Sequence, residues 1–357
     1  MRFNFSFDDI LKTDILLVDR NFGNLKFKNI NTEIFDYNKI YVKVLIKSIY
    51  LFLTKNKKKK KLKDIYLELF FTKVNAKLII GSHADGLIYR AKKLSPKSKI
   101  LVYLHTRLMN WEIYDLQKVL EKFQVDYIFA IDNIHENILK KNVKSEFILS
   151  GMVKNNEIFL EKEKKIYDVV YISEYRNVKY PERKLHFKFI KYIAKVLNEY
   201  ALENPNVRVA IAPNCNRPDK KISRKEETKF FKKISPNLEI SSKSNSYEIC
   251  NSAKLLICLN SNLGADFLSR GHKVLFLPFM HLYGDKYTNM YLPIKKKIFF
   301  VNRKFNQKII FDKINYLLNL DENTWDQELT KSNTRIYFDK DNTILKKKVR
   351  EIIESFK

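Results

Sequence analysis

The amino-acid sequence predicts an α/β protein built from two Rossmann-like domains that face each other across a cleft. Short apolar runs alternate with stretches of helical periodicity, a pattern typical of parallel βαβ units whose strands are buried on both faces. The alternation occurs in two consecutive series, and a charged stretch without a compact apolar run, residues 152–168, lies between them. The length of 357 residues and the apolar content of 45% suffice for two cores of ordinary size.

The first series predicts an N-terminal domain over residues 1–155. Its expected strands are the apolar runs at residues 14–19, 76–82, 99–106, 126–132 and 146–151. Its expected helices are the amphipathic stretches at residues 40–54, 62–73 and 111–123. Polar residues follow several of these strands, and ligands in open α/β sheets bind outside the carboxyl ends of strands.

The second series predicts a C-terminal domain over residues 167–330, joined to the first by a linker at residues 156–166. Its expected strands are residues 167–173, 207–213, 253–261 and 273–278. Its expected helices are residues 182–205, 225–234, 263–270 and 303–320. Residues 331–357 are expected to form a separate helical tail.

The net charge of +28 indicates a surface that favours anionic partners such as nucleic acid, phosphorylated substrates or an acidic membrane face. The abundant Lys, Asn, Ile and Phe also suit an AT-rich coding sequence, which would make part of the charge compositional. The sequence has no RNA- or DNA-binding signature, so no nucleic-acid partner is expected. The amphipathic stretch at residues 40–54 is followed by the basic run Lys57–Lys61. This pair can lie on anionic lipid, and the alternative is a domain helix followed by a solvated loop.

The N-terminus and the cysteines favour a cytoplasmic location, at most at the inner face of a membrane. The first residues carry acids early and lack the apolar segment of a secretory signal, and residues 40–54 are too short for a membrane span. The three cysteines, Cys215, Cys250 and Cys258, have neither metal-ligand spacing nor an even count for bridges. Neither a metal site nor a cofactor is expected.

The segment CLNSNLGADFLSRGHKVLFLP holds the densest group of candidate binding residues. A strand ends in a polar turn, and a short helix starting near Asn262 or Leu263 would point its free backbone N–H groups at an anion. Ser261 can cap this helix or bind a phosphate oxygen, and Gly264 would let a phosphate approach the backbone. Asp266 lies about one turn inside, within reach of a sugar hydroxyl. This arrangement suits a nucleotide, and the alternative is a capped helix whose acid only complements the dipole.

The part SNLGADFLSRGHKVLFLPF of this segment resembles the donor-binding segment of GT-B glycosyltransferases. In the bacterial N-acetylglucosaminyltransferase that forms lipid II, an acid five residues before a glycine contacts the nucleotide ribose. Asp266 stands five residues before Gly271, where that family usually has Glu. Together with VDYIFAIDNIHENILKKN, FILSGMVKNN and VVYISEYRN, the region from Lys77 to Pro278 resembles bacterial surface-carbohydrate and O-antigen biosynthesis transferases. It resembles the polyglycerophosphate transferase superfamily more loosely.

This resemblance implies a metal-independent transferase of GT-B fold with the acceptor on the N-terminal domain and the nucleotide donor on the C-terminal domain. The donor would be a nucleotide sugar, and the acceptor a surface-polysaccharide or lipid-linked glycan. Ser173 and Arg176, after the first strand of the second domain, would contact the donor phosphates. His83, Asp85 and His105, at strand ends of the first domain, are the candidates for the base that removes the acceptor proton.

Two alternative functions remain open on the sequence. One is a phosphotransferase of the glycerophosphate type that uses a CDP-linked polyol donor. The other is a GT-B-like protein that binds a nucleotide or glycan without turnover. For the histidines, the alternative is a structural hydrogen bond at a strand end.

Overall fold

The structure is a computed structural model that describes residues 3–18, 27–54, 60–108, 110–161, 164–175, 182–214, 224–242, 245–278, 299–332 and 336–356. The chain divides into two compact units. Unit 1 consists of Met1–Thr106, Glu112–Glu157 and Asp339–Lys357, and unit 2 consists of Arg107–Trp111 and Ile158–Phe338. The division near residue 157 falls at the start of the expected linker. The expected tail differs, because Asp339–Lys357 belongs to unit 1 rather than standing apart.

Unit 1 is built on a six-stranded parallel sheet with the order β3-β2-β5-β6-β7-β8. Its strands are β2 (Ile15–Leu17), β3 (Thr32–Ile34), β5 (Leu78–Ser82), β6 (Lys99–Tyr103), β7 (Tyr127–Ala130) and β8 (Glu146–Leu149). The central strands consist almost entirely of buried apolar residues, as the continuous apolar runs predict. The side chains that follow β5, β6 and β7 therefore emerge at one edge of the sheet, because parallel strands end on the same side.

The helices of unit 1 are α1 (Val42–Thr54), α2 (Leu62–Val74), α3 (Gly86–Leu94), α4 (Asn110–Phe123), α5 (Asn133–Leu139), α6 (Val153–Asn156) and α13 (Thr343–Glu354), with a short 3₁₀ turn η4 (Lys340–Asn342) before the last. Helix α13 joins the unit through a stripe at helical spacing, since Leu345, Val349 and Ile352 are buried in the same cluster as Ile15 and Leu78. The segment predicted as a tail is therefore part of the core of unit 1.

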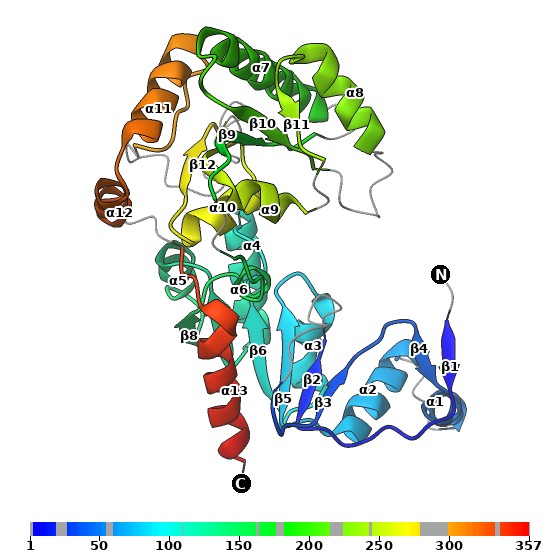
Figure 1. The fold of residues 1–357 in the computed structure, drawn as a ribbon. Coiled ribbons are helices and arrows are strands. Elements are labelled where there is room, and N and C mark those ends of the chain that lie inside the picture. Colours follow the sequence, from blue (N-terminus) through cyan, green and yellow to red (C-terminus); the bar gives the residue numbers. More distant parts are fainter. Residues whose placement is uncertain are drawn as a thin grey trace. The chain divides into compact units, whose positions relative to one another are not determined.

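A second, two-stranded sheet pairs β1 (Asn4–Ser6) with β4 (Lys39–Tyr41) in parallel, and α1 follows β4 directly (Figure 1). The helix expected over residues 40–54 therefore begins later, at Val42, because the residues before it pair with the N-terminal strand. The described part of the chain contains no helix of the length and apolarity needed to span a bilayer.

Unit 2 contains a five-stranded parallel sheet with the order β11-β10-β9-β12-β13. Its strands are β9 (Tyr167–Ile172), β10 (Val209–Ala212), β11 (Glu239–Ile240), β12 (Ala253–Cys258) and β13 (Lys273–Phe276). Its helices are α7 (Glu182–Glu203), α8 (Arg224–Ile234), α9 (Ser246–Asn251), α10 (Asn262–Ser269), α11 (Gln307–Asn319) and α12 (Glu322–Lys331). Helices α7, α8 and α11 lie on one side of the sheet, and α9 and α10 lie on the other (Figure 1). The strand order reverses at β9, so the topological switch point lies between β9 and β12.

Candidate functional site

The carboxyl ends of β9 and β12 form the best-defined candidate binding site in unit 2. Ser173 and Glu174 follow β9, and Asn260 and Ser261 follow β12. The Glu174 carboxylate links the two ends, because its Oε1 accepts a hydrogen bond from the backbone N–H of Asn260 at 2.6 Å. Ligands of doubly wound sheets bind at this position, outside the strand ends at the switch point.

The side chain of Asn260 is the most informative feature of this site. It is 5% exposed, and among the described residues neither its amide oxygen nor its amide nitrogen has a hydrogen-bond partner. A buried amide without partners costs about 1–3 kcal/mol, so such groups usually face a ligand or a water. Asn260 begins the polar turn that the sequence predicts after this strand, but it is not among the predicted binding residues.

Helix α10 begins directly after this amide, as the motif predicts. Ser261 is its N-cap, and the Ser261 hydroxyl accepts a hydrogen bond from the backbone N–H of Leu263 at 3.2 Å. Asn262 is exposed and Leu263 partly exposed in the first turn of the helix. The N-terminus of α10 and the Asn260 amide thus supply hydrogen-bond donors at one strand end, which suits an anionic group.

Gly264 has a packing role that the sequence did not predict. A Cβ at this position would lie 2.5 Å from the Sγ of Cys258 and 3.4 Å from Cε1 of Phe276. The glycine is buried against β12 and β13, so it allows the helix to pack closely on the sheet. Helix–sheet packing is therefore one reason for this glycine, and a close approach of a phosphate to its backbone stays a prediction.

Asp266 makes a hydrogen bond to Tyr247 that the sequence did not predict. Its carboxylate is 8% exposed and accepts a hydrogen bond from the Tyr247 hydroxyl of α9 at 2.5 Å. Burial and the neighbouring carboxylate raise the pKa of Tyr247, so the phenol keeps its proton and remains the donor. A ribose contact of Asp266 stays a prediction, and it would share the carboxylate with Tyr247.

Ser173 is held by a buried acid from α8. Its hydroxyl donates to Oε1 of Glu227 at 2.5 Å, and the same carboxylate accepts the backbone N–H of Asn214 at 3.0 Å. Glu227 is fully buried, and through these two hydrogen bonds it joins the ends of β9 and β10. Arg176, the predicted partner of the donor phosphates, lies outside the described residues, as do Lys57–Lys59 of the basic run and Cys215.

In unit 1 the structure brings His83 and His105 together at the ends of β5 and β6. Their rings stack with centroids 4.6 Å apart and an interplanar angle of 23°. The Nδ1 atom of His105 lies 2.7 Å from the Ser82 hydroxyl. The backbone N–H of His105 donates to Nδ1 of His83 at 3.4 Å. The two rings therefore differ in their surroundings, although they sit on neighbouring strands.

Burial is the main cause that lowers the pKa of His83 to about 3, and the neighbouring His105 adds to it. His83 is therefore neutral near pH 7, with its Nδ1 occupied as an acceptor. A histidine with so low a proton affinity is a poor general base. Of the two histidines, His105 is the better candidate for proton removal.

Asp85 serves mainly to cap a helix. Its carboxylate accepts the backbone N–H of Leu87 at 2.9 Å at the start of α3, and it accepts the Tyr37 hydroxyl at 2.6 Å. At the next strand end, Asp132 caps α5 and lies 2.7 Å from Nδ1 of the buried His135. Neither Asp132 nor His135 is among the predicted site residues, although both stand in the stretch VDYIFAIDNIHENILKKN that carries the family resemblance.

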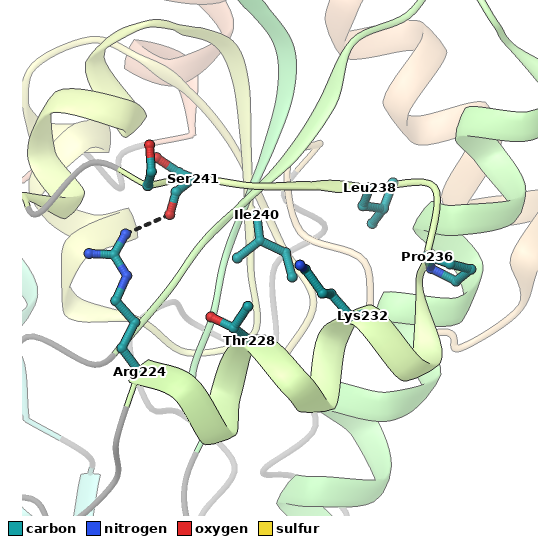
Figure 2. A pocket seen from close by; sticks show the side chains of 8 residues that line it. Arg224, Thr228, Lys232, Pro236, Leu238, Ile240 and Ser241 are labelled. Atoms are coloured by element: carbon teal, nitrogen blue, oxygen red, sulfur yellow. Dashed lines mark hydrogen bonds between the residues drawn. The ribbon is translucent and has the colours of Figure 1, made fainter.

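A groove of about 630 Å³ lies beside the edge strand β11 in unit 2 (Figure 2). Helix α8 contributes Arg224, Thr228 and Lys232 to one wall, and Ile240 and Ser241 lie on the other. Arg224 donates to the backbone carbonyl of Ser241 at 2.6 Å across its end. Of the predicted donor-binding residues that the structure describes, none lines this groove, which lies at the sheet edge, two strands away from the switch point.

Comparison with solved structures establishes the fold. UDP-GlcNAc 2-epimerase from Neisseria meningitidis bound to UDP-GlcNAc aligns with a TM-score of 0.53 at 13% identity, over 96% of this chain and 99% of that one. The wall teichoic acid polymerase TagF aligns with a TM-score of 0.51 at 10% identity, over 97% and 91%. A chain of the GtfA/B complex aligns with a TM-score of 0.48 at 10% identity over 82% of this chain, which spans 60% of that longer chain.

The first two likenesses confirm the predicted α/β class with parallel sheets and two Rossmann-like units of GT-B type. No curated protein matches the sequence significantly. A family model described as "putative O-antigen biosynthesis protein" matches residues 102–353, well over half of the chain. The protein therefore belongs to this O-antigen biosynthesis family.

Proposed function

We propose that the protein is a glycosyltransferase that moves a sugar from a nucleotide-sugar donor to a surface-polysaccharide or lipid-linked glycan acceptor. Membership of the O-antigen biosynthesis family supports the pathway class, and the GT-B type fold supports the transferase class. The observation that carries the proposal is the buried Asn260 amide without a described partner, beside the N-terminus of α10 at the switch point. This arrangement is suited to a nucleotide diphosphate.

In this proposal the carboxyl edge of unit 2 holds the donor. Asn260 and the first N–H groups of α10 bind the diphosphate, and Arg176, which follows β9 in the sequence, contacts it. Ser173 donates its hydroxyl proton to Glu227 and so holds the end of β9 in place. When the bond between the anomeric carbon and the phosphate oxygen breaks, the nucleotide leaves with an additional negative charge. Fixed donors aimed at that charge stabilise the transition state more than the ground state. Asp266 supports the ribose, in competition with Tyr247.

The carboxyl edge of unit 1 supplies the base. His105 can donate its Nδ1 proton to the Ser82 hydroxyl, and in that tautomer Nε2 is the basic nitrogen. Nε2 takes the proton of the acceptor hydroxyl while the acceptor oxygen forms its bond to the anomeric carbon. Ser82 is then a positioning residue that fixes the ring, and neutral His83 packs on its face without adding a charge.

A thermal-shift screen tests the donor site. UDP, GDP, CMP and CDP are added in turn, and a nucleotide that binds the native state raises the melting temperature by mass action. Asn260→Ala removes a buried amide that has no described partner, so the ligand-free protein should melt at the wild-type temperature or above it. The same variant should lose most of the nucleotide-induced shift. A full shift in Asn260→Ala, or no shift with any nucleotide in the wild type, would refute the donor site.

A turnover assay tests the base and separates the reaction classes. Release of sugar from the donor supports glycosyl transfer, release of glycerol phosphate supports a polyol phosphotransferase, and binding without release supports a binding protein. His105→Ala should lower kcat by about 10²-fold or more while the nucleotide-induced thermal shift is kept. His83→Ala should have a smaller effect on kcat. The reverse order of the two variants would assign the base to His83.

We also place this activity at the cytoplasmic face of a membrane. The net charge of +28 and the basic run Lys57–Lys61 after α1 support an anionic surface as a partner. Binding to anionic vesicles that weakens with salt is the expected behaviour, because exposed charges are screened. Equal binding to neutral vesicles would contradict an electrostatic attraction.

A further inference from the structure

The N-terminal part of unit 1 carries an exposed apolar patch on two adjoining elements. We define the patch as Phe3, Phe5 and Phe7 on and around β1 together with Ile46, Tyr50 and Leu53 on α1. All six residues are between 51% and 73% exposed. Large apolar residues exposed singly are normal, but a contiguous group of them marks an interaction surface or a membrane contact.

The spacing of the six residues places each set of three on one face. Phe3, Phe5 and Phe7 alternate along an extended strand, so their side chains point the same way, while Ser6 between them is buried. Ile46, Tyr50 and Leu53 follow the i, i+4, i+7 spacing of one helix face. The opposite face of α1 is packed, since Val44 and Ser48 are buried. Helix α1 is therefore apolar on a face that the described residues leave exposed.

Strand pairing and an ion pair hold the two elements next to each other. Strand β1 pairs with β4, and β4 continues without a loop into α1 (Figure 1). Asp9 follows β1 in the chain, and its carboxylate lies 2.9 Å from Nζ of Lys43 on the first turn of α1. The two apolar rows therefore belong to one local structure.

Positive charge borders the patch. Lys47 is exposed on the flank of the apolar face of α1, beside Lys43, which is paired with Asp9. The run Lys57–Lys61 follows the helix in the sequence. A second copy of this chain would bring the same lysines and the same net charge of +28 against each other. An anionic lipid surface instead offers headgroups to the lysines and acyl chains to the aromatic and aliphatic side chains.

We propose that this apolar patch inserts into the interface of an anionic bilayer and so anchors unit 1 to the membrane. The insertion is shallow, because an interfacial helix buries only its apolar face and a strand presents one row of side chains. At this surface the proposed transferase would meet a lipid-linked acceptor, and only this role of the patch rests on the proposed function. Binding itself needs neither donor nor turnover.

Vesicle flotation of the full chain tests the insertion. The vesicles contain phosphatidylcholine alone or with phosphatidylglycerol, and binding is measured at low and at high salt. The patch variant combines Phe5→Ser, Phe7→Ser and Leu53→Ser. The control combines Tyr114→Ser, Leu202→Ser and Tyr316→Ser, which are 46% to 59% exposed on other elements. All of these side chains are largely exposed, so neither variant should unfold, and matching melting temperatures establish this.

The wild type should bind the anionic vesicles and keep part of its binding at high salt, because the apolar contribution is not screened. The patch variant should bind at least about tenfold more weakly, since three inserted apolar side chains are lost, while the control binds like the wild type. Wild-type binding in the patch variant would overturn the proposal. A second outcome would also overturn it: the wild type does not bind vesicles and is a dimer in light scattering, whereas the patch variant is a monomer. That result would assign the patch to contact with a second copy of the chain.

The nucleotide-induced thermal shift, measured on the same samples, keeps the two proposals apart. A patch variant that loses vesicle binding and keeps this shift separates the membrane surface from the donor site. If the wild type does not bind vesicles but shows the nucleotide-induced thermal shift, the membrane anchor is refuted and the transferase proposal is not.

Discussion

Replacing Gly264 by alanine tests the structural reason for the glycine in the helix of the donor segment. The added Cβ would lie 2.5 Å from the Sγ of Cys258, a separation that buried carbon and sulfur atoms do not tolerate, and 3.4 Å from the ring of Phe276. Both neighbours are fully buried on β12 and β13, so neither can move without disturbing the sheet. We therefore expect Gly264→Ala to destabilise unit 2.

The magnitude follows from two opposing effects. Overpacking of a buried position by one methyl group costs about 1–3 kcal/mol. Alanine in place of glycine inside a helix returns up to about 1 kcal/mol. The net loss should be about 1–2 kcal/mol. Cys258→Ala removes the sulfur that the new methyl group meets, so the double variant should be more stable than the sum of the two single changes by about 1 kcal/mol or more.

Denaturant unfolding measured by circular dichroism gives the free energies of unfolding for the double-mutant cycle of Gly264→Ala and Cys258→Ala. Gly86→Ala is the matched control, because Gly86 opens helix α3 and nothing lies within 4 Å of an added Cβ. This control should be neutral or slightly more stable than the wild type. Wild-type stability in Gly264→Ala would refute the packing argument and restore the role of the glycine as a place of close ligand approach. If the two single changes in the free energy of unfolding simply add, the new methyl group does not contact the Sγ atom of Cys258.

Three further predictions concern buried polar groups. Burial holds the pKa of His83 at about 3 in the native state, below the 6.5 of the unfolded chain, so the unfolded state binds the extra proton as the pH falls. The stability that neutral His83 contributes is present above pH 6.5 and is lost as the pH falls toward 3. In urea unfolding, His83→Asn should therefore reduce the loss of stability between pH 7 and pH 5 by about 2 kcal/mol, and an unchanged loss would contradict the shift. Glu227→Leu leaves the Ser173 hydroxyl and a backbone N–H without their acceptor, so it should lower the free energy of unfolding by about 2–4 kcal/mol, and Glu227→Gln by less. Equal losses in these two variants would point to packing instead of hydrogen bonding. Tyr247→Phe removes the hydrogen bond to Asp266 and should lower the melting temperature of the protein in calorimetry, by the equivalent of about 1–2 kcal/mol. No change in melting temperature would mean that water replaces the phenol at Asp266.

The sheets could be predicted from the sequence because their strands are buried on both faces. Continuous apolar runs such as AKLIIGS and AKLLICLNS became β5 and β12, and the cap at Ser261 began α10 where the motif indicated. The two-residue strand β11 was not predicted, since Glu239 and Ile240 form too short a run to show a period. Strand β4 was not predicted either, because its apolar residues continue the helical pattern of α1.

The candidate site was less predictable, because its contacts join residues far apart in the sequence. Nothing near Asp266 in the sequence indicates that Tyr247 bonds to it, and nothing near Ser173 indicates Glu227. Gly264 shows the same limit, since a glycine in a polar turn before a helix fits both close ligand approach and close packing. The packing reason becomes visible only in the structure, from the position of Cys258 on β12. The stacking of His83 on His105 could have been predicted, because adjacent parallel strands place the residues that follow them side by side.

The split of unit 1 into separate stretches of the chain has a consequence for biosynthesis. The ribosome makes a protein from its N-terminus, and domains generally fold as units as they emerge. Unit 2 is almost continuous from Ile158 to Phe338, whereas the core of unit 1 includes Leu345 and Val349 on α13. The nascent chain can therefore complete unit 2 while unit 1 still lacks the α13 side chains of its core. During that interval unit 1 is the part of the chain that most needs a chaperone, although it was translated first.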